Sequence, residues 1–350
     1  MPLLAVVIAD DLTGALDTAT PFALAGMSVA AALTAEAAER ALACNTDVVV
    51  VNTASRNLTP TAAVARMRAL ARAIGRHHPG LVLKKIDSRL KGNIAVEAEG
   101  LAHALGFTRA IVAPAVPDQG RIVLDGAVTG RGVGVPIPIA PLFAGSTLEL
   151  EIVDTRGDSD LDALVAPGSH NWSTTLAIGA RGLGAAFARR HGPLLQRPFP
   201  REEATLFSVG SRDPITAVQI QRLRTQYPDL TTLEVGSAGP AENLPGLPGL
   251  LTAAGMLEDN SERVSARLAE ATAQQIAMLQ PSTIVASGGD TALALLEALG
   301  VDLVFPEGEA APGLPWFSFV HNAKRMRFVV KSGGFGQEDA LAALLPSRAG

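Results

Sequence analysis

The feature of this sequence that most restricts its fold is a regular alternation of short apolar runs with alanine-rich segments of helical periodicity. In the first 113 residues the apolar runs are Leu3–Ala9, Val29–Leu33, Asp47–Asn52, Leu81–Ile86 and Ala110–Ala113. The helical segments between them are Thr13–Ala25, Pro60–His77 and Asn93–Leu105. Runs such as Val48–Val51 are apolar on both faces, which is typical of parallel strands covered by helices on both sides. This order predicts a doubly wound α/β domain.

The alternation breaks between Pro114 and about Gly168, where prolines and glycines are dense. Within this segment, Leu124-Asp125-Gly126-Ala127 predicts a hairpin turn between two short strands. We interpret the segment either as an insertion beside the sheet or as an elaborated edge of the first domain. After a further strand at Leu176–Ile178 and a helix at Leu183–Arg190, the stretch Leu194–Arg201 is the best candidate for a linker, because it holds two prolines and little periodicity.

A second alternating series follows the linker. Its predicted strands are Thr205–Val209, Thr231–Val235, Thr283–Ser287, Trp316–Val320 and Arg327–Lys331. Its predicted helices are Pro214–Gln226, Glu262–Leu279, Thr291–Leu299 and Gln337–Leu345, and the stretch Gly236–Asn260 is ambiguous. The predicted fold class is therefore α/β, with two doubly wound domains at residues 1–200 and 201–350. Mainly parallel sheets and a ligand cleft between the domains are expected.

Charge and composition exclude several classes of protein. The 350 residues carry 29 lysines and arginines against 34 aspartates and glutamates, a balance that argues against a general nucleic-acid binder. The single cysteine, Cys44, excludes an intrachain disulfide and a multi-cysteine metal site. The apolar run Leu3–Ala9 is too short for a signal peptide, and no stretch approaches the roughly 18 apolar residues of a membrane span. A cytoplasmic protein without nucleic-acid or membrane partners is expected; its oligomeric state, a homodimer included, stays open.

Charged residues follow the predicted strands of the first domain. Asp10 and Asp11 follow the first strand, Arg56 the third, and Asp87 the fourth. The carboxyl ends of parallel strands converge on one edge of a sheet. Basic side chains in these loops predict a cationic pocket for a small carboxylate or phosphate, because guanidinium groups bind such anions with two parallel hydrogen bonds. The basic members are Arg56, Arg89, Arg121, Lys85 and Lys91.

The acidic members of these loops suggest a second role. Asp10, Asp11 and Asp87 could accept hydrogen bonds from substrate hydroxyls, or one of them could act as general base. The sequence leaves the choice of base open between Asp11 and Asp87. The alternative interpretation assigns these loops to strand-end salt bridges and helix caps, with Thr13 and Asn93 as suitable N-cap residues.

Glycine-rich turns mark the second domain. Three predicted strands run into Val209–Pro214, Ser287–Ala292 and Lys331–Gly336. Glycine lets backbone N–H groups approach a phosphate closely, and a following helix N-terminus favours negative charge. The sequence contains neither a Walker P-loop nor a dinucleotide fingerprint after its first strand, and its six histidines show no metal-ligand spacing. The prediction is a nucleotide site built from these turns, with no residue assigned as a metal ligand.

Five of these stretches together resemble the four-carbon acid sugar kinase family. They are Ala9–Ala15, Lys85–Asn93, Pro114–Arg121, Ser287–Ala292 and Lys331–Gly336, so the resemblance covers nearly the whole chain. It implies an N-terminal domain that binds a sugar acid and a C-terminal domain that binds ATP, with Mg²⁺ accompanying the nucleotide. It also implies phosphorylation of the terminal (4-) hydroxyl of a tetronate such as threonate, erythronate or 3-oxo-tetronate.

The resemblance and the strand-end loops together define a set of expected site residues. The expected catalytic residues are Asp11 and Asp87. The expected substrate-binding residues are Asp10, Asp11, Arg56, Lys85, Ile86, Asp87, Ser88, Arg89 and Arg121. The expected ATP-binding residues are Ser211, Gly288, Gly289, Asp290, Gly333, Gly334, Phe335 and Gly336.

The sequence departs from the family in two places. It is shortened between about Gly130 and Gly168, and Arg212-Asp213 stands where small residues are expected. A non-catalytic regulator that binds the sugar acid and the nucleotide is the alternative function.

Overall fold

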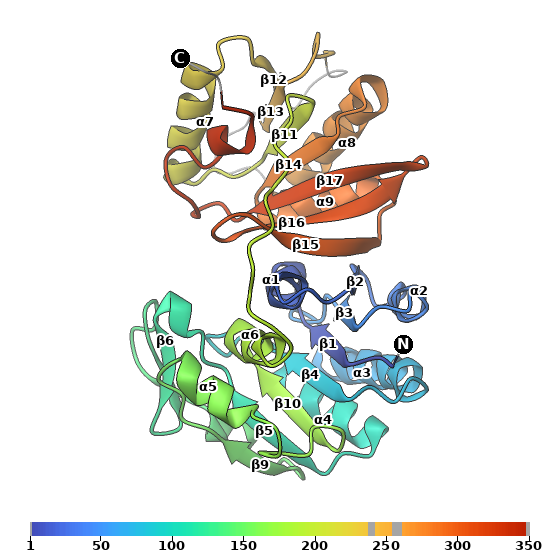
Figure 1. Cartoon of the computed structure of the whole chain (residues 1–350), viewed down its shortest axis with the longest axis vertical. Coiled ribbons are helices and arrows are strands. Elements are labelled where there is room, and N and C mark those ends of the chain that lie inside the picture. The colour runs from blue at the N-terminus through green and yellow to red at the C-terminus, as the bar shows by residue number, and fades with distance from the viewer. Residues whose placement is uncertain (1, 237–241, 254–260, 348–350) are drawn as a thin grey trace. The chain divides into compact units, whose positions relative to one another are not determined.

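The computed structural model describes residues 2–236, 242–253 and 261–347, and the chain forms two compact units, residues 1–195 and 196–350 (Figure 1). The division falls inside the predicted linker Leu194–Arg201 and five residues before the predicted boundary. Each unit is built on one sheet that carries helices, as the alternation of periods predicts. Among the described residues, no helix combines the length and apolarity that crossing a bilayer requires.

The N-terminal unit contains a parallel sheet with strand order β2-β3-β1-β4-β10-β5-β9. Its strands are β1 (Ala5–Ala9), β2 (Val29–Ala32), β3 (Val48–Asn52), β4 (Leu81–Lys85), β5 (Arg109–Ala113), β9 (Glu149–Ile152) and β10 (Thr175–Gly179). The first five agree with the predicted strands to within two residues. Because β1 pairs with β3 on one side and β4 on the other, the loops that leave these three strands are neighbours.

Helices cover both faces of this sheet (Figure 1). One face holds α1 (Leu12–Leu24), α6 (Arg181–Arg189) and α5 (Asp158–Leu164), and the other holds α3 (Pro60–Gly75) and α4 (Ile94–Leu105). The short α2 (Ala38–Leu42), which the sequence analysis did not predict, packs against β2 and β3. Thr59 caps α3 by accepting from the N–H of Ala62, and Pro60 takes the first helical position.

The irregular segment contributes both an insertion and an edge to the first unit. The strands β6 (Arg121–Leu124), β7 (Ala127–Gly130) and β8 (Ile137–Pro138) form a small antiparallel sheet, and β9 extends the main sheet at its edge. Asp125 and Gly126 form the predicted hairpin turn, with φ angles of 50° and 69°. The carboxylate of Asp154 accepts from both of their N–H groups, at 2.8 and 2.9 Å.

The C-terminal unit has strand order β12-β13-β11-β14-β17-β16-β15, of which the last two strands are antiparallel to their neighbours. Its strands are β11 (Thr205–Val209), β12 (Thr231–Val235), β13 (Gly249–Ala253), β14 (Thr283–Ser287), β15 (Leu303–Ala311), β16 (Leu314–His321) and β17 (Lys324–Lys331). Its helices are α7 (Pro214–Gln226), α8 (Ser261–Leu279) and α9 (Gly289–Ala298). β13 lies in the ambiguous stretch, of which 237–241 and 254–260 fall outside the described residues. β15 was not predicted, because Pro306 and Gly308 interrupt its pattern.

The predicted helix at Gln337–Leu345 is wrong. This segment forms turns and a short 3₁₀ helix, η3 (Ala342–Leu344). The carbonyl of Gln337 accepts from the N–H of Ala340 and from the side chain of Gln219, so it does not continue an α-helical ladder. The apolar residues that suggested a helix, such as Leu341 and Leu345, are buried in the core of the unit.

A buried ion pair lies beneath the end of β4. The Nζ atom of Lys84 is 2.9 Å from Oε2 of Glu97 in the first turn of α4, and both side chains are at most 1% exposed. The same Nζ donates to the carbonyl of Lys85. This pair therefore fixes α4 to the carboxyl end of β4, where the loop of predicted site residues begins.

Candidate functional site

Five charged side chains gather where β3, β1 and β4 end. They are Asp10, Asp11, Arg56, Lys85 and Asp87. Arg56 binds Asp10 with two hydrogen bonds, from Nε to Oδ2 at 2.8 Å and from Nη2 to Oδ1 at 3.0 Å. The Asp10 side chain is only 4% exposed, so Arg56 is the cation that makes its burial tolerable. The nearby carboxylates in turn raise the pKa of Arg56 even though burial opposes this, so the guanidinium stays charged.

Asp11 is engaged at both of its carboxylate oxygens. Its Oδ1 lies 2.9 Å from Nη2 of Arg56 and 3.2 Å from Nζ of Lys85, and it caps α1 by accepting from the N–H of Gly14. Its Oδ2 accepts from the hydroxyl of Thr13 at 2.7 Å. Burial by itself would raise the pKa of Asp11, but Lys85, Thr13 and Arg56 outweigh it and lower the pKa below its ordinary value. Asp11, and not Thr13, is thus the N-cap of α1.

Asp87 differs from Asp11 in having one uncommitted oxygen. Its Oδ1 accepts from the N–H groups of Arg89 at 2.9 Å and Lys91 at 3.4 Å. Its Oδ2 lies 3.9 Å from Nη2 of Arg56 and accepts no hydrogen bond from the described residues. The side chain is 18% exposed. Asp87 can therefore accept a proton or a hydrogen bond from a ligand without breaking an existing one.

The basic side chains of the strand-end loops fall into two groups. Arg56 and Lys85 are paired with aspartates, as the alternative interpretation of strand-end salt bridges allows. Arg121 contacts no carboxylate among the described residues and donates instead to Ser88 Oγ at 2.7 Å, which ties the insertion to the β4 loop. Arg89 is exposed, as is Lys91. These three residues provide the positive charge that aspartates do not offset.

Two predicted residues near this cluster have structural roles in the fold. The side chain of Ile86 is 1% exposed, and its N–H donates to the carbonyl of Gly179, so only its carbonyl remains available. Asn93 precedes α4 but does not cap it with its side chain. Its amide donates instead to the carbonyls of Ser55 and Leu58, which joins the loops after β4 and β3.

The glycine turns of the C-terminal unit lie side by side at the ends of β11, β14 and β17. The N–H groups of Gly210 and Ser211 donate to the carbonyl of Ser287, and the N–H of Gly288 donates to the carbonyl of Lys331. A Cβ atom at Gly333 would lie 2.5 Å from Ser211 Oγ, so a larger residue there would have to displace the Ser211 hydroxyl. The structure thus brings together three turns that are far apart in the sequence.

The other predicted residues of these turns lie around the same place. Gly288 has a φ of 112° and precedes α9, which begins at Gly289. Asp290 is exposed in the first turn of that helix, and Phe335 is 44% exposed. Arg212 is exposed, while Asp213 caps α7 by accepting from the N–H of Ile215 at 2.9 Å. Helix capping therefore explains the aspartate of the Arg212-Asp213 pair, where the family is expected to have small residues.

Three buried polar residues beneath these turns were missed by the sequence analysis. They are Thr216 and Gln219 on α7 and Lys331 at the end of β17, and all are fully buried. Lys331 donates to Thr216 Oγ1 and to the carbonyls of Ser332 and Gly333. A lysine that ends an apolar strand directly before a glycine turn was the signal available in the sequence.

The burial of Lys331 predicts a pH-dependent stability. Burial lowers its pKa from 10.5 to about 8, an effect that nearby Asp213 opposes. The unfolded chain therefore binds more protons than the folded protein between these two values, so the free energy of unfolding should rise with pH across this window. We expect wild type to gain stability relative to Lys331→Met between pH 7.5 and pH 9.5, as measured by urea unfolding. If the difference in the free energy of unfolding between the two proteins stays constant over this pH range, the lowered pKa of Lys331 is contradicted.

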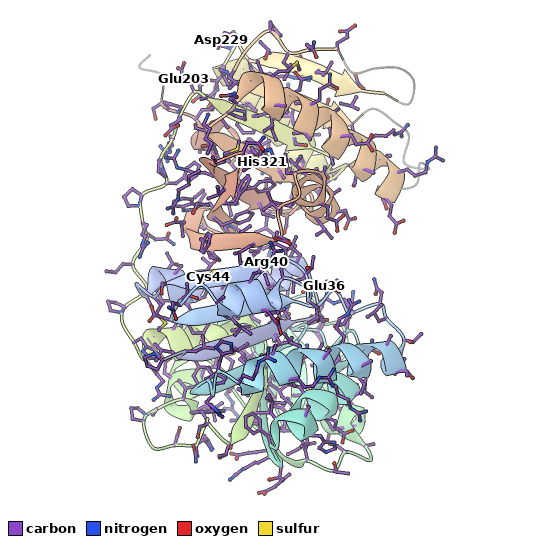
Figure 2. All side chains as sticks on the ribbon, turned by 90° about the vertical axis from the view of Figure 1, so that its right-hand side faces the viewer. Glu36, Arg40, Cys44, Glu203, Asp229 and His321 are labelled. Atoms are coloured by element: carbon purple, nitrogen blue, oxygen red, sulfur yellow. The ribbon has the colours of Figure 1, made fainter. Side chains whose placement is uncertain are left out.

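We also searched the described residues outside these two sites for metal ligands and reactive nucleophiles. In residues 2–236, 242–253 and 261–347, no three His, Cys, Asp or Glu side chains are grouped so as to hold a metal ion. Cys44 follows α2 (Figure 2), and its Sγ donates to the carbonyl of Arg40. Burial raises the pKa of this thiol, so it is not an activated nucleophile at neutral pH. His321 lies at the end of β16 beside Asn322.

Comparisons with known proteins agree with this two-part arrangement. Residues 5–171 match the model of a sugar-binding N-terminal domain, and residues 249–341 match that of a nucleotide-binding C-terminal domain. The chain is 30% identical to a D-threonate kinase of Cupriavidus necator, with 96% of each chain covered. It is 25% identical to a D-erythronate kinase of Heliobacterium modesticaldum, covering 96% of this chain and 94% of the relative.

A solved structure shares the fold. A protein from Salmonella typhimurium LT2 aligns with a TM-score of 0.74 at 18% identity, over 97% of this chain and 98% of that one. The two domain matches and the full-length relatives show that the chain belongs to the four-carbon acid sugar kinase family.

Proposed function

We propose that this protein transfers the γ-phosphoryl group of ATP to the terminal (4-) hydroxyl of a four-carbon sugar acid such as threonate, erythronate or 3-oxo-tetronate. The observation that carries this proposal is the Asp10, Asp11, Arg56, Lys85 and Asp87 cluster at the ends of three adjacent strands. A polyhydroxy acid needs both anion-binding and hydroxyl-binding groups, and this cluster places the two kinds within hydrogen-bond distance of one another. The kinase names of the full-length relatives support the same reaction class.

The carboxylate of the acid is proposed to bind to the positive charge at this edge of the sheet. Arg121 carries a guanidinium with no carboxylate partner among the described residues, and Ser88 beside it offers a hydroxyl. Arg56 uses Nε and Nη2 for the aspartates, which leaves its Nη1 without a hydrogen bond to the described residues. A planar carboxylate can bind to such donors, whereas the acids around Arg56 would hold the hydroxyl groups.

Asp87 is proposed as the general base. Its free Oδ2 would accept the proton of the terminal hydroxyl while that oxygen forms a bond to the γ-phosphorus. The bond between the γ-phosphorus and its bridging oxygen to the β-phosphate then breaks, and ADP leaves. Asp11 is proposed to position the acid and the start of α1, because both of its oxygens are engaged and its pKa is lowered.

The glycine turns of the C-terminal unit are proposed to bind the nucleotide. The residues proposed to contact it lie at the ends of three adjacent strands; they are Ser211, Gly288, Gly289, Asp290 and the Gly333–Gly336 turn. A nucleotide-borne Mg²⁺ needs few protein ligands, so we expect it to be held mainly by the phosphates. When bound, Mg²⁺ would neutralise charge on those phosphates. The cleft that would bring acid and nucleotide together remains a prediction.

A direct assay tests the proposed function. ADP release would be measured with Mg·ATP and a panel of threonate, erythronate and 3-oxo-tetronate stereoisomers, together with longer aldonates. ADP production that depends on one tetronate would support the proposal and name the substrate. No ADP release with any tetronate, while ATP still raises the melting temperature, would overturn the acceptor class. If ATP has no effect on the melting temperature either, the proposed nucleotide site is wrong.

Gly14 supplies a prediction about the Asp11–Lys85 pair. A Cβ atom at this position would lie 1.7 Å from Lys85 Nζ and 2.4 Å from Asp11 Oδ1. Gly14→Ala should therefore displace Lys85 from Asp11 and raise the KM for the sugar acid by roughly tenfold, the value of one charged hydrogen bond. The KM for ATP should change little. The control is Gly134→Ala, since a Cβ there meets no atom within 4 Å; equal KM changes in both variants would contradict the assignment.

A further inference from the structure

In the last glycine turn, Ser332–Gln337, four backbone carbonyls accept hydrogen bonds from buried side chains. The carbonyl of Gly333 accepts from Thr216 Oγ1 at 2.8 Å and from Lys331 Nζ at 2.7 Å. The carbonyl of Ser332 also accepts from Lys331. Gln219 Nε2 donates to the carbonyls of Phe335 and Gln337, at 3.0 and 2.8 Å.

These contacts set the direction of the N–H groups in the turn. In a trans peptide the N–H points opposite to the C=O of the same peptide plane. The inward carbonyls of Ser332, Gly333 and Phe335 therefore turn the N–H groups of Gly333, Gly334 and Gly336 away from the buried side chains. Those three N–H groups donate to no acceptor within the described residues. Several backbone N–H groups directed to one side form an anion-binding nest.

Lys331 and Thr216 are joined in a hydrogen-bonded network, while Gln219 contacts the same turn through Nε2 alone, its Oε1 having no partner among the described residues. A lysine ammonium has three donors, and Lys331 has three acceptors: Thr216 Oγ1 and the carbonyls of Ser332 and Gly333. Thr216 accepts from Lys331 and donates to Gly333. Because the network is fully buried, water cannot replace a lost donor without entering the core, and loss of one bond should let the turn rotate.

We infer that Thr216, Gln219 and Lys331 are positioning residues that orient the N–H groups of Gly333, Gly334 and Gly336 toward the phosphates of the nucleotide. This inference rests on the proposed function, because it takes ATP as the ligand of the turn. It assigns the network to phosphate binding and not to recognition of the base and ribose.

The experiment compares wild type with Thr216→Val, Thr216→Ser and Gln219→Met. Steady-state kinetics would give the KM for ATP and for the sugar acid, and calorimetry would give the affinities for ATP and for inorganic tripolyphosphate. Thr216→Val and Gln219→Met should weaken ATP and tripolyphosphate binding by about tenfold each, the usual effect of one buried hydrogen bond. The KM for the sugar acid should stay within twofold, and Thr216→Ser, which keeps the hydroxyl, should bind ATP as wild type does.

A matched control separates positioning from stability. Ser208 on β11 and Thr272 on α8 form a buried hydroxyl pair at 2.9 Å in the same unit. Thr272→Val should lower the melting temperature much as Thr216→Val does, but leave ATP binding unchanged. Unchanged ATP binding in Thr216→Val, or an equal loss in Thr272→Val, would overturn the inference. If wild type itself binds neither ATP nor tripolyphosphate, the proposed function fails and the inference fails with it. The wild-type measurement alone therefore tests the proposed function, and the variants test the inference.

Discussion

Replacing Arg56 with methionine is expected to lower the free energy of unfolding by about 3 kcal/mol and to abolish sugar-acid binding. The Arg56 guanidinium makes two hydrogen bonds to Asp10 and one ion pair to Asp11. Asp10 is only 4% exposed, so its charge would be left buried without a partner. Removing one partner of a buried pair is more destabilising than removing both, because the remaining charge keeps its desolvation penalty.

The comparison variants follow from this reason. Arg76→Met breaks the ion pair between Arg76 and Glu39, two side chains that are 63% and 70% exposed. It should change the free energy of unfolding by less than about 1 kcal/mol. The double variant Arg56→Met/Asp10→Asn should recover part of the lost stability, because it removes the uncompensated charge. Urea unfolding measures all three. If Arg56→Met is no less stable than Arg76→Met, the description of Asp10 as dependent on Arg56 is wrong.

Asp87→Asn is expected to lower kcat by about 10²- to 10⁴-fold, the usual contribution of a general base. The change keeps the shape of the side chain and an oxygen that can accept from the N–H groups of Arg89 and Lys91. The fold should therefore persist. Because the amide cannot take a proton, the loss should appear in kcat and much less in the KM for the sugar acid.

Asp11→Asn serves as the comparison that distinguishes the two candidate bases. Asp11 caps α1 and binds Lys85 and Arg56, so its replacement should raise the KM for the sugar acid and lower the melting temperature. A mutation that spares the base should leave more residual kcat than Asp87→Asn does. If Asp87→Asn keeps wild-type kcat and Asp11→Asn does not, the roles proposed for these residues are exchanged. An additional control, Asp118→Asn, alters an aspartate that is half exposed and paired with Arg181.

The alternation of periods in the sequence was sufficient to predict most of the fold. Strands β1 to β5 of the first unit and the helix Pro214–Gln226 match because their apolar patterns and flanking proline or glycine residues agree with the final structure. The failures occurred where a distant contact overrode the local pattern. At Gln337, a side chain from α7 takes the carbonyl that a helix would have used, and β15 forms as the antiparallel partner of β16 despite Pro306 and Gly308.

The candidate sugar-acid site was predicted by its residues but not by their pairing. That charged side chains follow β1, β3 and β4 is visible in the sequence. That Arg56 is bound by Asp10 and Asp11, while Asp87 keeps a free oxygen, depends on which strands are neighbours. Sequence spacing carries no information on such pairings, since Arg56 and Asp10 lie 46 residues apart.

By itself, the sequence determined the α/β class, the two-part organisation and the residues that lie at the ends of the strands. Periodicity and turn residues act over a few positions, and these properties follow from them. Only the tertiary structure decided which of these residues meet and which way each group faces. The carbonyls of the Ser332–Gln337 turn show the reason: their direction is set by Thr216 and Gln219, more than 100 residues earlier in the chain. Such long-range hydrogen bonds exist only after the sheet has brought its strand ends together.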